Sequence, residues 1–168
     1  DHRWHHGLWF SWKLINGVNY WENDGKTGKP AGRTAWQVKS VDKRGDGSCR
    51  IVLELEYAPV GGEIVLREHR VLAVVAPGSD GSFAVDWECT FTAAQDCVLD
   101  RTPPPGAPGG KANGGYAGLS VRLANLDQRQ AVTTSGAVAW NKDDRFRTKA
   151  AAMDYGGLLQ GQEVGVAV

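Results

Sequence analysis

Residues able to do acid–base or metal chemistry crowd the first stretch of the sequence. Residues 1–6, with the sequence DHRWHH, hold three of the four histidines. Imidazole gains and loses a proton near neutral pH and is a common metal ligand. Tryptophan is also concentrated here, at Trp4, Trp9 and Trp12, and indole rings stack on flat ligands. This density of reactive and stacking side chains indicates a functional site.

The local geometry decides what these histidines can do. If the segment is extended, His2, Trp4 and His6 face one way and His5 faces the other. If it forms one helical turn, His2, His5 and His6 share a face and could bind a transition metal. A third alternative is that the imidazoles only hydrogen-bond neighbouring backbone at the start of a strand. We favour His5 and His6 as catalytic acid or base, and no bound metal is predicted.

The fourth histidine lies in a stretch of alternating residues. Alternation places Glu68 and Arg70 on one face of the expected strand, and Arg67 and His69 on the other. This pattern is typical of a solvated strand face with salt bridges. It is also compatible with a cleft floor into which His69 or Glu68 points, so both residues are candidate catalytic residues.

A pair of carboxylates lies on a later strand. Asp86 and Glu88 share a polar face, and carboxylates two residues apart along a strand are separated by roughly 7 Å. This separation falls within the broad range that acid–base pairs acting on sugars use. Most strand faces with Asp and Glu are simply solvated, so this pair remains a minor alternative.

The remaining aromatic and polar residues indicate the class of ligand. Aromatic rings stack on the apolar face of a sugar, while Arg, Asn, Asp and His bind its hydroxyl groups. Arg122 could anchor a carboxylate or a pair of hydroxyls, and a structural salt bridge is the alternative. The candidate substrate-binding residues are His2, Trp4, Trp9, Trp21, Tyr116, Arg122 and Asp154.

Composition excludes several partners. The chain of 168 residues has a formal net charge of zero and a pI near 7.1, so a nucleic-acid partner is not expected. The longest apolar runs are far shorter than the roughly 20 residues that span a bilayer, so membrane insertion is not expected either. Three widely spaced cysteines, Cys49, Cys89 and Cys97, form no CxxC pair, and we interpret them as buried thiols. No cofactor is predicted.

The periodicity of the chain is that of strands. Glycine and proline interrupt the sequence at short intervals, and no segment of ten or more residues repeats apolar positions at helical spacing. Runs with a period of two predict strands, and glycine-containing turns between them predict antiparallel hairpins. The fold class predicted is all-β: an antiparallel β-sandwich formed by one domain, residues 1–168. The strands are expected at 34–40, 49–57, 63–75, 83–91, 118–123 and 163–168, with surface loops at 23–32 and 102–115.

Both ends of the chain look cut. The densest motif stands at residue 1, where chains are usually frayed, and the apolar alternation of residues 163–168 is still running where the sequence stops. We therefore expect a partial domain, truncated at both ends, from a longer protein.

Several motifs together resemble a known family. They are the DHxxHHGLW start, Asn16-Gly17-Val18-Asn19-Tyr20-Trp21-Glu22, the GGYxGLSVR segment ending at Arg122, and Met153-Asp154-Tyr155-Gly156-Gly157. Over nearly the whole chain this order resembles a bacterial domain-of-unknown-function family usually labelled "methane oxygenase PmoA-like". In strand pattern and histidine placement that family is similar to galactose-mutarotase-like supersandwich proteins, which implies a carbohydrate-active domain. Methane oxygenase activity is not expected, because the oxygenase's membrane subunit is helical and this chain is strand-rich.

We therefore favour an enzyme that acts on a sugar or glycoside, such as an epimerase, with His5 or His6 and a carboxylate exchanging protons. The alternative is a non-catalytic carbohydrate-binding module that uses the same aromatic residues and Arg122. A metal-dependent enzyme built on the first histidines is the least favoured. The expected partner is a small carbohydrate. The oligomeric state is left open, and a periplasmic or secreted location is slightly favoured over a cytoplasmic one.

Overall fold

The alternating segments form the longest strands of the protein. The computed structural model describes residues 7–111, 117–140 and 149–168. Every regular element in these ranges is a strand, and none of these residues belongs to a helix that could cross a membrane. Neighbouring strands of the longer sheets pair antiparallel. The predicted all-β class with antiparallel pairing is confirmed, and it is consistent with a β-sandwich.

The chain divides into two compact units. Residues 10–119 form one, and residues 1–9 with 120–168 form the other. Two strands, β1 (Gly7–Trp12) and β9 (Ala117–Arg122), run from one unit into the other. The single domain expected over residues 1–168 stays a prediction, and each unit is described by itself.

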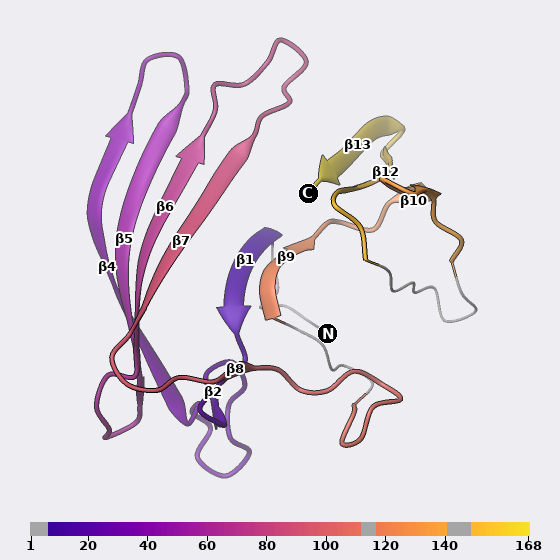
Figure 1. Ribbon diagram of the computed structural model, residues 1–168. Coiled ribbons are helices and arrows are strands. Elements are labelled where there is room, and N and C mark those ends of the chain that lie inside the picture. Colours follow the sequence, from indigo (N-terminus) through magenta and orange to yellow (C-terminus); the bar gives the residue numbers. More distant parts are fainter. Residues whose placement is uncertain (1–6, 112–116, 141–148) are drawn as a thin grey trace. The chain divides into compact units, whose positions relative to one another are not determined.

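A four-stranded sheet dominates the unit of residues 10–119. Figure 1 shows its long strands side by side in the order β4, β5, β6, β7. The hairpins turn at Gly47, Gly61 and Gly81, whose positive φ values of 87°, 75° and 82° are readily adopted only by glycine. This confirms the expected turns. The strands are β4 (Gly32–Lys43), β5 (Cys49–Pro59), β6 (Leu66–Val74) and β7 (Val85–Ala93).

The core of this unit lies on one face of the sheet. The buried residues Leu55, Tyr57 and Leu66 pack there with Ile15 and Val65. Ile15 belongs to a small antiparallel sheet of short strands, whose hairpin turns through Asn-Gly, the pair favoured in tight turns. Its strands are β2 (Leu14–Ile15), β3 (Val18–Asn19) and β8 (Leu99–Asp100).

The other unit contains a second four-stranded sheet, in the order β11, β10, β12, β13. The pairing of β10 with β12 is interrupted by a bulge between Asp127 and Gln130, where Gln128 has a φ of 50°. Gly157 is required opposite this bulge, because a Cβ there would lie 2.6 Å from the carbonyl oxygen of Asp127. The strands are β10 (Asp127–Thr133), β11 (Gly136–Ala137), β12 (Met153–Leu159) and β13 (Gln162–Ala167).

Candidate functional site

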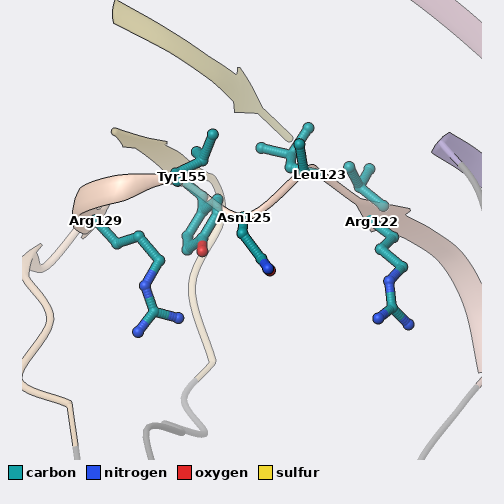
Figure 2. A pocket seen from close by; sticks show the side chains of 8 residues that line it. Arg122, Leu123, Asn125, Arg129 and Tyr155 are labelled. Carbon is teal, nitrogen blue, oxygen red and sulfur yellow. The ribbon is translucent and has the colours of Figure 1, made fainter. Parts of the chain in front are cut away.

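A polar pocket lies in the unit that contains β10 and β12. It has a volume of about 510 Å³, and Arg122, Asn125, Arg129 and Tyr155 supply its polar lining. Figure 2 shows the side chains of Arg122, Asn125 and Arg129 on the same side of the backbone, with the Tyr155 hydroxyl between Asn125 and Arg129 in this view. The rest of the lining comes from Val121, Leu123, Ala124 and Leu126.

The local fold explains why these side chains line one pocket. Arg122 is the last residue of β9, and the chain then continues past buried Leu126 into β10. The bulge before Gln130 changes the direction of β10 at Arg129. Tyr155 is paired with Ala131 across β10 and β12, so its ring lies next to the segment that presents both arginines.

An aromatic contact holds one side of the pocket. The guanidinium carbon of Arg129 lies 5.7 Å from the ring centroid of Trp140, and the Trp140 ring is edge-on to Tyr155 at 6.0 Å. A cation over an indole face is attracted by the ring's quadrupole. Trp140 therefore orients both Arg129 and Tyr155.

The pocket is rich in hydrogen-bond donors and has positive charge. Arg122 is exposed and makes no ion pair or hydrogen bond within the described part of the chain. None of the residues that line the pocket is Asp, Glu or His. Each guanidinium has five N–H donors and no acceptor. This arrangement can bind carbonyl, hydroxyl or anionic oxygen atoms, but its lining offers no carboxylate or imidazole.

Asp154 lies in a different hollow. Consecutive residues of a strand point to opposite faces, and Asp154 lines a groove of about 460 Å³ that includes neither Tyr155 nor Arg122. Polar side chains of Gln128, Gln130 and Glu163 line the same groove. Of the two candidate binding residues Arg122 and Asp154, only Arg122 therefore lies in the pocket with Tyr155.

Glu68 lies in the interior of the other unit, on the inner face of the β4–β7 sheet. Its side chain is fully buried, and the Tyr57 hydroxyl donates to it at 2.5 Å. Arg70 donates to both of its oxygens, from Nε at 2.5 Å and from Nη2 at 3.0 Å. The guanidinium of Arg70 also lies over Trp87, at 5.1 Å, and over Phe10, at 5.7 Å.

The titration behaviour of the neighbours fits a closed cluster. Burial, reinforced by the hydrogen bond to Glu68, raises the pKa of Tyr57 above its usual value. Burial and then the interaction with Glu68 raise the pKa of Cys89 to about 11, so this thiol is protonated at neutral pH. Because both of its oxygens already accept hydrogen bonds, we expect a structural role for Glu68, and its candidate catalytic role stays a prediction.

His69 lies on the opposite, solvated face of β6. Its Nδ1 is 2.8 Å from Glu54 Oε1, and both side chains are about half exposed, at 47% and 46%. Arg67 forms a second surface pair with Glu56, at 3.6 Å. Glu68 and His69 therefore do not converge on one site.

Two of the other predicted site residues, Trp9 and Trp21, lie within the described ranges. Trp9 is half-buried in β1, and Trp21 is half-buried in a turn where its backbone N–H donates to Asn19 Oδ1 at 2.9 Å. Within the described ranges no three His, Cys, Asp or Glu side chains gather as metal ligands, and the three cysteines are free thiols. The residues that lie outside the described ranges are His2, Trp4, His5, His6 and Tyr116.

Sequence reasoning missed Asn125, Arg129 and Tyr155 as pocket residues. Tyr155 had a usable signal, because it lies in the polar-aromatic run that begins at Met153. Asn125 and Arg129 had none, since their positions depend on the bulge in β10.

The fold and pocket define an all-β protein with a polar pocket, and comparison with known proteins adds the family. The model of a family of unknown function, DUF6807, matches residues 1–168. The chain therefore belongs to this family. No curated protein and no solved structure matches the chain.

Proposed function

We propose that this protein is carbohydrate-active and that the pocket lined by Arg122, Asn125, Arg129 and Tyr155 binds the sugar. The observation that carries the proposal is that two guanidinium groups, an amide and a phenol line one hollow of about 510 Å³. These groups bind oxygen atoms at fixed directions, and a volume in this range suits a small ligand. The resemblance to the PmoA-like family, and through it to galactose-mutarotase-like supersandwich proteins, supports the same class of ligand.

Binding is the part of this function that the described residues support best. The pocket has donors to hold a sugar but no carboxylate or imidazole to move a proton. A carbohydrate-binding role therefore needs only residues whose positions are described.

Calorimetry tests the binding proposal. We would titrate the protein with a panel of neutral and acidic mono- and oligosaccharides and expect heat from at least one of them. Asn125→Ala combined with Tyr155→Phe should weaken that binding, because both groups line the pocket, whereas Gln37→Ala on the exposed surface of β4 should not. The absence of heat with every sugar, or full affinity in the double variant, would contradict the proposal.

Catalysis is a second candidate function, because residues 1–6 concentrate three imidazoles that titrate near neutral pH. In this version His5 or His6 exchanges a proton with a hydroxyl of the bound sugar, with a carboxylate as its partner. Exchange of both His5 and His6 for Gln should abolish turnover and leave sugar affinity nearly unchanged. Full turnover in this variant would eliminate the two histidines as acid–base groups.

A further inference from the structure

The balance of donors and acceptors in the pocket bears on which sugars it selects. The two arginines supply only donors, and acceptors come from the amide oxygen of Asn125 and the hydroxyl of Tyr155. A neutral sugar presents hydroxyl groups that donate as well as accept, so carboxylate acceptors would suit it, and the lining contains none. A carboxylate or a sulfate group only accepts hydrogen bonds and has the opposite charge.

The arginines differ in how they are held, and both arrangements suit an anionic group. Arg122 is exposed and has no carboxylate partner among the described residues, so its charge is not neutralised there. The guanidinium of Arg129 is stacked on Trp140, which restricts its orientation before a ligand arrives. A guanidinium fork of this kind binds carboxylate or sulfate oxygens in pairs.

We propose that the pocket selects acidic saccharides, and that Arg122 binds their carboxylate or sulfate group. This inference rests on the proposed function, because it assumes that the pocket binds sugars. It adds the chemical class: a uronic acid or a sulfated sugar, with the remaining hydroxyls facing Asn125 and Tyr155.

Matched pairs of sugars test this selectivity in the full chain. Galacturonic acid and galactose differ only in the acidic group, and galactose 6-sulfate separates a sulfate from a carboxylate. By calorimetry we expect at least one acidic sugar to bind about 10- to 100-fold more tightly than galactose, the usual range for charge-assisted hydrogen bonds. Equal affinity for all three sugars would overturn the inference while leaving a sugar pocket in place. No heat from any of them, together with none from the wider panel, would remove the proposed function itself.

Inorganic anions and one pair of variants complete the test. Acetate and sulfate alone should bind at least tenfold more weakly than the acidic sugar, because they lack the hydroxyl contacts. Equal binding of the bare anion would mean an anion site and would overturn selection of a saccharide. Arg122→Gln should reduce the preference for the acidic sugar about tenfold or more by removing one charged fork. Arg33→Gln, an exposed change on β4, should leave the preference unchanged. An unaltered preference in Arg122→Gln would contradict the role of Arg122.

Discussion

Two arginines on different sheets show how the same side chain serves structure in one place and recognition in another. Arg70 donates to both oxygens of buried Glu68 and is covered by Trp87 and Phe10. Arg122 lines an open pocket and makes no ion pair within the described residues. A buried charge is tolerated only when it is paired, whereas an exposed charge remains hydrated and available to bind a ligand.

We infer that the β4–β7 sheet and the segment that forms the pocket have different roles. On the sheet of β4–β7 the charged side chains have partners within the protein, because Tyr57 and Arg70 both donate hydrogen bonds to Glu68. The segment that leads into β10 keeps its charged side chains at a pocket surface. We expect changes in the first region to affect folding and changes in the second to affect binding.

The largest expected effect comes from breaking the closed cluster. Glu68→Ala leaves the guanidinium of Arg70 and the hydroxyl of Tyr57 buried without their acceptor, which should lower the free energy of unfolding by about 3–5 kcal/mol. Urea denaturation measures this loss. Glu54→Ala on the solvated face of the same sheet is the control, and removal of its exposed pair with His69 should cost less than about 1 kcal/mol.

The same pair of variants can break the comparison. If Glu68→Ala is as stable as Glu54→Ala, the cluster of Tyr57, Glu68 and Arg70 does not stabilise the fold. If Glu68→Ala remains folded but no longer binds the saccharide, Glu68 is a functional residue, as its strand position first indicated.

A smaller effect is expected at the aromatic support of the pocket. Trp140→Leu removes the ring beneath Arg129 and should weaken saccharide binding by about 0.5–2 kcal/mol, the usual range of a cation–π contact. Trp36→Leu is a matched control, because this tryptophan is 67% exposed on β4. Equal affinities in the two variants, measured by calorimetry, would show that Trp140 does not position the pocket.

A pH dependence of stability is also expected, and it appears only at alkaline pH. The Cys89 thiol has an ordinary pKa of 9.0, and burial raises it to about 11 in the folded protein. Between these pH values the unfolded chain has released a proton that the folded chain retains, so the free energy of unfolding falls as pH rises. Tyr57 acts in the same direction above its ordinary pKa of 10.0, because its folded pKa is also raised.

Cys89→Ala separates the two groups. Urea midpoints measured from pH 8 to pH 11 should fall less steeply in this variant than in the unmodified protein, since one of the groups that release protons on unfolding is gone. A slope that does not change would mean that Cys89 is not coupled to the buried cluster.

The long strands could be predicted from the sequence because one face of their sheet is buried. The alternation in Cys49–Pro59 and Leu66–Val74 predicted both strands, and it correctly placed Glu68 and His69 on opposite faces. The alternation could not show whether Glu68 points into a cleft or into a closed cluster. That depends on Tyr57, which belongs to the neighbouring strand.

The second sheet was harder to predict for a physical reason. Within Asp127–Thr133 only Ala131 is buried, so the strand carries almost no hydrophobic pattern. Its bulge, with Gln128 at positive φ, has no signature in the sequence. Arg122 was identified because it ends a patterned strand, whereas Arg129 was missed because the bulge determines where its side chain lies.

An NMR titration can show directly whether the sugar binds at the Arg122 pocket. Galacturonic acid would be added to the ¹⁵N-labelled protein while the backbone amide shifts are followed. We predict that the largest changes fall at residues 121–129 and at Tyr155, with little change around Glu68 and His69. Changes centred on β5 and β6, with the pocket amides unaffected, would contradict it.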